Sequence, residues 1–412
     1  MTSAAPLPPN RPIYLDHHAT TPPDPRVLAA MRPWWEGNFA NPGSVEHAMG
    51  RAAEEAVEEA RREVAALIGA DPREVVFTSG ATEANNLAIK GAVRFLAAQG
   101  DERRRVITFA AEHKCALESV RDLAAEGFEP VVLPVRAGDG GYEVETLRAA
   151  LAERPTLLVS AMAVNNEIGT VQDVAALAAV AREHAALFHC DAAQAAGRVP
   201  VDVAAWGVDL LSLSAHKMYG PKGVGALYVR RRPRVRLAPL LSGGGQERGF
   251  RSGTLPTPLV VGFGAAARVA RLEGTLDTGR VAGQRDRFLA ALRAAVPGVE
   301  VNGPPLDGGA RVAANLSLAF PGGVDAGALM AAAPDLCVST GSACSSAEVE
   351  PSYVLRAIGV PEARARATLR LGFGRFTSPA DADRAAAILA RAWESARRAV
   401  SEPDPARPLA AE

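Results

Sequence analysis

The chain has 412 residues, of which 48% are hydrophobic and 22% charged, as in a globular protein long enough for two or three domains. Its formal net charge of −1 provides no overall field for nucleic acid or a membrane surface, and we expect no direct partner of either kind. Four cysteines, no secretory leader and no long apolar run favour a cytoplasmic protein with reduced thiols and no resident metal.

Hydrophobic spacing after a Pro-rich arm predicts strands that alternate with helices. The predicted strands are 13–16, 75–77, 106–109, 131–133, 157–159, 187–191, 208–214 and 223–229. The predicted helices are 47–68, one reaching Lys90, one including Leu117 and Leu123, 144–151 and 174–184. This alternation is typical of an α/β protein with a mostly parallel sheet covered on both faces, whose ligands bind at the carboxyl ends of the strands.

The pattern changes beyond a helix predicted from about Pro258 to Leu272. The later predicted elements are a helix at 279–296, a strand at 312–320, a small-residue loop at 335–350, a helix at 353–359, a strand at 369–373 and a helix at 379–399. We therefore expect a large α/β domain over 13–265, a smaller α+β domain over 266–400 and a disordered tail over 401–412. Residues 1–20 are expected to pack with the small domain.

A Gly- and Pro-rich turn carries Lys217 between two predicted strands. A partly desolvated lysine has a lowered pKa and forms Schiff bases with carbonyl cofactors, although a surface lysine in a hairpin loop has the same local pattern. Asp191 ends the preceding predicted strand, about one βαβ step earlier, so the two side chains are expected on adjacent strands. An Asp there suits the protonated ring nitrogen of pyridoxal phosphate or, alternatively, caps the next helix, and Gln194 follows within reach of the same ligand.

Three further positions each allow a functional and a structural interpretation. Thr78 to Glu83 is a strand-to-helix turn, which suits a phosphate site or a plain capping box. His113 directly follows a strand, where it either stacks on a flat cofactor and moves protons or is a loop residue. Arg370, in a short apolar strand, requires a carboxylate partner, which is either a ligand or a structural Asp or Glu.

Cys344 lies in the run Ser339-Thr-Gly-Ser-Ala-Cys-Ser-Ser-Ala347, which has no large apolar side chain. Such a run cannot join a core, so we expect an exposed loop and a thiol available as a nucleophile, or else an incidental surface cysteine. Cys190, in contrast, lies in an apolar strand.

Taken together, the motifs resemble those of the cysteine desulfurases, which are class V, fold type I enzymes dependent on pyridoxal 5′-phosphate (PLP). The resemblance covers about residues 12–395 and follows the family's order. Its motifs are Tyr14-Leu-Asp-His-His-Ala-Thr-Thr-Pro, Phe77-Thr-Ser-Gly-Ala-Thr-Glu, Glu112-His-Lys, Val164-Asn-Asn-Glu-Ile-Gly, Asp191-Ala-Ala-Gln, Ser214-Ala-His-Lys, Arg251-Ser-Gly-Thr-Leu-Pro, Gly341-Ser-Ala-Cys and Glu350-Pro-Ser-Tyr-Val-Leu-Arg. The long loop around Cys344 resembles the group that includes NifS and IscS.

The resemblance implies a large, mostly parallel seven-stranded-type sheet domain, a smaller α+β domain and a role for each matching residue. Lys217 carries the cofactor, Asp191 pairs with its ring nitrogen, and His113 stacks over the ring and moves protons. Gln194 contacts the 3-oxygen of the ring. The residues implied at the phosphate are Ala81, Thr82, Ser214, His216 and, from the other subunit, Thr254. The residues implied at the substrate carboxylate are Asn166 and Arg370.

By the same resemblance the protein is a homodimer with shared sites that converts L-cysteine to L-alanine and leaves a persulfide on Cys344. The sulfur then passes to a protein acceptor such as an iron–sulfur scaffold, or to another thio-cofactor or tRNA acceptor. Transient ligation of an iron–sulfur cluster by Cys344 is the one metal contact this implies. The alternatives are a selenocysteine lyase or another class V transaminase or lyase, and a non-catalytic protein with an inactive fold. His18, Ala193 and Cys115 depart from the usual pattern, and Cys115 adds a second thiol near the ring.

Overall fold

The computed structural model describes residues 11–340 and 351–401, and its centre is a seven-stranded sheet with the order β2-β8-β7-β6-β5-β3-β4. The strands are β2 (Val75–Thr78), β3 (Arg105–Phe109), β4 (Glu129–Leu133), β5 (Thr156–Met162), β6 (Leu187–Asp191), β7 (Leu210–Ser214) and β8 (Gly225–Val229). Strand β8 runs antiparallel to β2 and β7, whereas the other neighbouring strands pair in parallel. The predicted α/β class with a large, mostly parallel sheet is confirmed.

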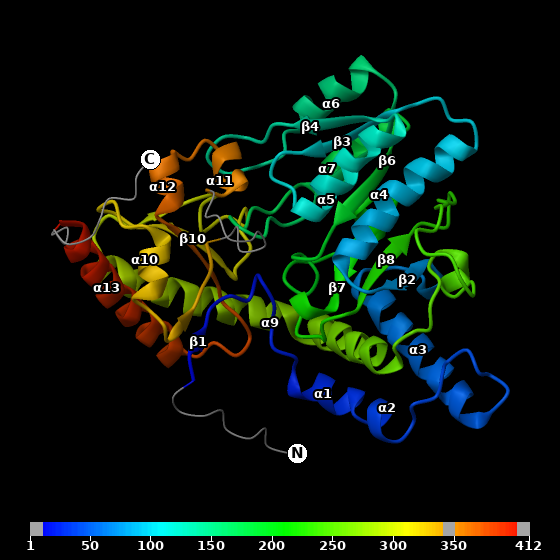
Figure 1. Cartoon of the computed structure of the whole chain (residues 1–412), viewed down its shortest axis with the longest axis horizontal. Coiled ribbons are helices and arrows are strands. Elements are labelled where there is room, and N and C mark those ends of the chain that lie inside the picture. Colours follow the sequence, from blue (N-terminus) through cyan, green and yellow to red (C-terminus); the bar gives the residue numbers. More distant parts are fainter. Residues whose placement is uncertain (1–10, 341–350, 402–412) are drawn as a thin grey trace.

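Helices cover both faces of this sheet, which explains why its strands are apolar without alternation. The helices are α3 (Ala48–Leu67), α4 (Ala81–Ala98), α5 (Lys114–Asp122), α6 (Val144–Glu153), α7 (Val174–Glu183) and α8 (Val203–Trp206). Successive residues of β2 point to opposite faces: Val76 packs in a core with α4 and α5, whereas Val75 and Phe77 pack in a core with α3 and α7. Figure 1 shows this unit on the right of the molecule.

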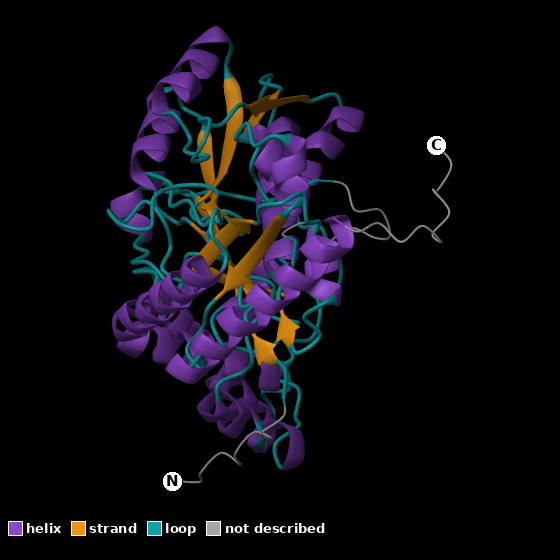
Figure 2. Ribbon diagram, turned by 90° about the vertical axis from the view of Figure 1, so that its left-hand side faces the viewer, coloured by secondary structure: helices purple, strands orange, loops and turns teal. Residues whose placement is uncertain are grey.

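A smaller unit lies beside the large sheet, on the left in Figure 1. It contains an antiparallel sheet of β12 (Thr368–Gly372), β10 (Asn315–Ala319) and β9 (Glu300–Val301). The parallel pair β1 (Ile13–Tyr14) and β11 (Leu336–Cys337) joins the start of the chain to this unit, and Ile13 and Leu15 lie in its core. Its helices are α10 (Ala326–Ala331), α11 (Tyr353–Ala357), α12 (Glu362–Arg366) and α13 (Pro379–Ser401). Figure 2 shows the sheets enclosed by helices.

One long helix, α9 (Thr257–Ala295, 39 residues), replaces the two helices predicted at 258–272 and 279–296. The two predicted ranges left a gap between residues 272 and 279, but tertiary packing keeps this segment helical. Phe263 belongs to the core of the large sheet, whereas Phe288 belongs to the core of the smaller unit. The domain boundary predicted after residue 265 therefore falls inside a helix that serves both cores.

The remaining elements are short. They are α1 (Pro25–Met31), α2 (Pro33–Glu36), η1 (Pro72–Glu74), η2 (Leu123–Glu126), η3 (Ala215–Lys217) and η4 (Glu247–Gly249). Within the part of the chain that the structure describes, no helix is both long and apolar enough to span a membrane.

Candidate active site

Strands β6 and β7 bring Asp191 and Lys217 to the same edge of the sheet. The two strands are parallel neighbours in which Asp191 is opposite Ser212, and Lys217 follows β7 in the single turn η3. Tyr219, two residues on, has a left-handed backbone (φ 66°), and the turn closes with the Gly220 N–H donating to the Ala215 carbonyl at 2.9 Å. The predicted adjacency therefore follows from strand order, and the tight turn places the lysine at the carboxyl edge.

A cavity of about 420 Å³ opens at this edge. The sequence-predicted site residues that line it are Ala81, Thr82, His113, Asn166, Asp191, Gln194, Ser214, His216 and Lys217. They come from five separate segments of the chain, which meet where β2, β3, β5, β6 and β7 end. A cavity of this volume holds a cofactor or a small substrate of a few hundred Å³.

The first turn of α4 forms one end of the cavity. Its N-cap is Gly80, which makes no side-chain capping bond, and the capping box suggested by the sequence is not formed. Glu83 instead accepts from the Ser79 N–H at 2.7 Å and pairs with Arg251 at 2.9 Å. Backbone N–H groups at the start of this 18-residue helix are thus left for an anion, at the favourable end of the helix dipole.

His216 also lines the cavity. Burial lowers the pKa of His216 to about 4, so the ring is neutral near pH 7. Its Nδ1 lies 3.1 Å from the Thr20 hydroxyl. A neutral imidazole here offers a single N–H to an anion without adding a charge.

The carboxylate of Asp191 is 6% exposed and lies at the middle of the cavity wall. Its Oδ1 accepts from the Ala193 N–H at 2.9 Å, and its Oδ2 accepts from Asn85 Nδ2 at 2.7 Å. A buried carboxylate held in this way is suited to a cationic ligand group.

The Lys217 ammonium donates to two backbone carbonyls of the N-terminal segment, those of His18 at 2.6 Å and Ala19 at 2.9 Å. Gln194 also contacts this segment, because its Nε2 donates to the His18 carbonyl at 2.9 Å. The segment that begins in the smaller unit therefore lies across the lysine of the large sheet.

His113 follows β3 and is the N-cap of α5, so it is not a plain loop residue. Its Nδ1 accepts from the Cys115 N–H at 3.2 Å and lies 2.9 Å from the Cys115 thiol. Burial lowers the pKa of His113, and burial together with the nearby Asp191 raises the pKa of Cys115 to about 12. Both groups are therefore neutral near pH 7.

Arg370 does not line the cavity but lies next to it. Its Nη2 pairs with Asp16 at 2.9 Å, and its Nη1 donates to the Asn166 carbonyl at 3.3 Å. The structural partner considered from the sequence is thus present as Asp16. The Nε of Arg370 is buried without a hydrogen-bond partner among the described atoms, so this N–H of the guanidinium is available to a ligand.

Among the predicted site residues that the structure describes, Thr254 joins Arg370 in not lining this cavity. Thr254 is exposed and does not line the cavity of its own chain. Cys344 lies outside the described residues. The three cysteines inside them, Cys115, Cys190 and Cys337, are free thiols. Among the described residues, no group of His, Cys, Asp and Glu side chains is arranged for a metal ion.

Sequence reasoning missed three residues that support the site, of which Asn85 and Glu112 are buried. Asn85 bridges Asp191 and Cys115, and its position one helical turn after Thr82 was an available signal. Glu112 accepts from the Tyr142 hydroxyl at 2.6 Å, and burial raises its pKa to about 8. Arg198 donates to the Lys217 carbonyl at 3.2 Å and to Gln194 Oε1, contacts that no local pattern indicates.

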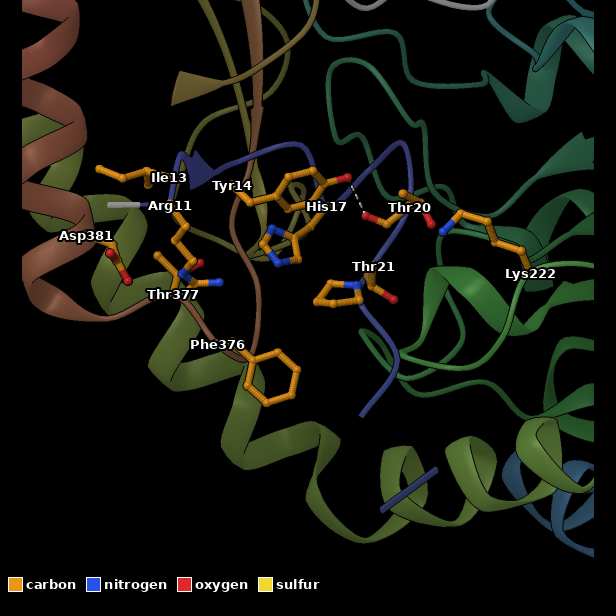
Figure 3. A pocket seen from close by; sticks show the side chains of 11 residues that line it. Arg11, Ile13, Tyr14, His17, Thr20, Thr21, Lys222, Phe376, Thr377 and Asp381 are labelled. Atoms are coloured by element: carbon orange, nitrogen blue, oxygen red, sulfur yellow. Dashed lines mark hydrogen bonds between the residues drawn. The ribbon is translucent and has the colours of Figure 1, made fainter. Parts of the chain in front are cut away.

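A second cavity of about 290 Å³ lies on the other side of the N-terminal segment (Figure 3). Tyr14 and His17 lie against each other in it with ring centroids 5.0 Å apart, and the Tyr14 hydroxyl donates to the Thr20 carbonyl at 2.9 Å. Lys222 lines both cavities, which makes residues 14–21 a thin wall between them.

Comparisons with known proteins agree with this geometry. The family model described as "Aminotransferase class-V" matches residues 13–385. The chain is 50% identical over 381 residues to the cysteine desulfurase IscS of Rickettsia felis, an alignment covering 92% of this chain and 91% of that protein. A solved "NifS-like protein" superposes with a TM-score of 0.83 at 33% identity, covering 93% of this chain and 99% of that one. The structure described as "SspA in complex with cysteine" superposes with a TM-score of 0.77 at 37% identity, covering 89% and 99%.

Proposed function

The chain belongs to the class V aminotransferase family and, within it, to the cysteine desulfurases, and we propose that it uses PLP to convert L-cysteine to L-alanine. The observation that carries the proposal is the one cavity that Lys217, Asp191 and His113 line together. The cysteine bound to the related SspA supports the choice of substrate.

The donor set of the cavity fits PLP. The uncapped start of α4, with His216 and Ser214, suits a phosphate, and Thr254 of a second copy is proposed to add a contact. The buried Asp191 carboxylate suits a protonated pyridine nitrogen, and Gln194 suits the 3-oxygen. Lys217 lies within the same cavity, as a covalent attachment requires.

Bound PLP supplies an electron sink for the carbon skeleton of the amino acid. The residues of this chain supply binding and proton transfer. Asp191 would keep the ring nitrogen protonated, His113 would move protons beside the substrate, and Lys217 would take and return the proton of the α-carbon. Arg370 and Asn166 are proposed to hold the substrate carboxylate, with Arg370 held in orientation by Asp16.

Sulfur transfer is proposed to occur at the thiol of Cys344. The C–S bond of cysteine breaks, its electron pair stays with the carbon skeleton, and the sulfur forms an S–S bond with Cys344 Sγ. Protonation of the carbon skeleton gives alanine, so one thiol and one cysteine become one persulfide and one alanine. Desulfuration needs a thiol nucleophile and plain transamination does not, so the presence of Cys344 favours desulfuration. The presence of Lys217, Asp191 and His113 as well as Cys344 argues against an inactive fold.

We further propose a cytoplasmic homodimer that passes the persulfide sulfur to a protein acceptor. IscS relatives at 50% identity make an iron–sulfur scaffold the first acceptor to test, with thio-cofactor and tRNA acceptors next. The exposed Thr254 supports shared sites, because it lies on the surface of its own chain.

The test is release of alanine and sulfide from L-cysteine in the presence of a thiol reductant. Wild type is expected to release equal amounts, whereas Cys344→Ser is expected to bind PLP but release no sulfide. Cys337→Ser, a control in β11, is expected to behave as wild type. Lys217→Ala is expected to purify without the yellow colour of the lysine-bound cofactor. Full sulfide release by Cys344→Ser would refute the persulfide step.

A further inference from the structure

A continuous set of hydrogen bonds joins the two residues proposed to contact the cofactor ring. Asn85 is fully buried and donates through Nδ2 to both Asp191 Oδ2, at 2.7 Å, and Cys115 Sγ, at 3.1 Å. The Cys115 sulfur in turn lies 2.9 Å from His113 Nδ1. Asp191 and His113 are thus linked through Asn85, which is buried, and Cys115, which lines the cavity.

The start of α5 defines the role of His113 Nδ1. The backbone N–H of Cys115 donates to this nitrogen at 3.2 Å as the N-cap bond of the helix, and only a nitrogen without a proton accepts such a bond. The Cys115 sulfur already accepts from Asn85, so its own S–H is free to donate. The backbone N–H and the thiol of Cys115 therefore both direct a hydrogen at His113 Nδ1.

We propose that Cys115 is a positioning residue whose thiol, donating to Nδ1, holds His113 in the tautomer that carries its proton on Nε2. The ring nitrogen left for groups in the cavity is then always Nε2. The inference rests on the proposed function only for its consequence, which is that substrate protons are exchanged at Nε2. Cys115 is not a second sulfur acceptor in this arrangement.

The charges around the pair are consistent with two neutral groups. The groups that act on the His113 ring from neighbouring elements are Asp191, Lys217, Arg370 and Lys114. A thiolate–imidazolium pair would show a lowered thiol pKa and a raised imidazole pKa. Here burial shifts both pKa values in the opposite directions, so Cys115 keeps the proton that it donates.

The test is nitrogen NMR of the full-length protein with isotopically labelled histidine, as purified with its cofactor and again after cofactor removal. Three proteins are compared: wild type, Cys115→Ala and Cys115→Ser, with His113→Gln used to assign the signals. In wild type, Nδ1 is expected to resonate as an unprotonated nitrogen and Nε2 as a protonated one. Cys115→Ala removes a donor to the neutral ring, so the pKa of His113 is expected to rise by about half a unit to one unit. Cys115→Ser, which keeps a side-chain donor, is expected to restore the wild-type pKa of His113.

The pH profile of alanine formation gives a second readout. The acidic limb of this profile is expected to shift to higher pH in Cys115→Ala and to return to its wild-type position in Cys115→Ser. A purely structural role would not produce this pattern. A protonated Nδ1 in wild type, or an unchanged pKa of His113 in Cys115→Ala, would overturn the inference. Wild type that shows the expected tautomer but forms no alanine would refute the proposed function and leave the positioning role standing.

Discussion

The ion pair between Arg61 and Glu247 is expected to be among the most important side-chain contacts for stability. Arg61 donates from both terminal nitrogens to the two carboxylate oxygens of Glu247, each at 2.8 Å. The two side chains are 4% and 2% exposed, and the Phe77 N–H donates to Glu247 Oε2 at 2.7 Å. Glu247 itself has a left-handed backbone (φ 49°), so these contacts also hold a strained turn.

The perturbation is Glu247→Gln, which keeps the shape of the side chain but removes its charge. An amide group must then turn its NH₂ toward either Arg61 or the Phe77 N–H, so at least one pair of donors faces each other. Breaking a buried ion pair on one side costs about 3–5 kcal/mol, because the remaining charge stays buried. We expect the free energy of unfolding to fall by about this amount.

The assay is urea unfolding followed by circular dichroism, at one protein concentration for all variants. The matched control is Glu59→Gln, which breaks a pair with Arg62 whose side chains are 58% and 53% exposed. Exposed pairs contribute about 0–1 kcal/mol, so the control is expected to stay close to wild type. A loss below about 1 kcal/mol in Glu247→Gln, or equal losses in the two variants, would refute the reasoning.

Two further predictions concern a titrating carboxyl and a close backbone contact. Burial raises the pKa of Glu112 from 4.5 to about 8, so its contribution to stability is fully present below about pH 4.5 and is lost as the pH rises through about 8. As the pH rises between these values, the free energy of unfolding, measured in urea, is expected to fall less in Glu112→Gln than in wild type. An equal fall in the two proteins would contradict this. A Cβ on Gly225 would lie 2.5 Å from the Leu213 carbonyl oxygen and 2.7 Å from the Gly80 backbone. Gly225→Ala is therefore expected to displace the start of α4, at the proposed phosphate site. The variant is expected to lose PLP on dialysis, which the absorbance of the cofactor measures. The control Gly283→Ala, where no atom lies within 4 Å, is expected to retain PLP and gain about 0.5–1 kcal/mol of stability; equal PLP retention in both would contradict the prediction.

The sheet and the lysine site were predictable because their signals are local. The apolar runs that became β6 and β7 need burial on both faces, and that requirement alone indicates a parallel sheet with Asp191 and Lys217 at one edge. The turn at Lys217 contains its own glycines and proline. These features depend on neighbours in sequence, so spacing was sufficient to predict them.

The contacts that orient the site residues were not predictable, because they join distant parts of the chain. Asp16 meets Arg370 across 354 positions, and nothing near either residue indicates the other. The continuity of α9 likewise depends on two cores that form on either side of residues 273–278. For His113, its role as the N-cap of α5 determines which ring nitrogen is engaged, and the helix boundary could not be located that accurately from spacing.

Helix α9 has a consequence for how the molecule denatures. At about 1.5 Å per residue its 39 residues extend for nearly 60 Å, and its two halves are buried in different cores. Neither core can melt alone without exposing the apolar side of half the helix, such as Phe263 or Phe288. The shared helix therefore links the two halves of the molecule into one cooperative unit, and the cavity at Lys217 is lost in the same transition.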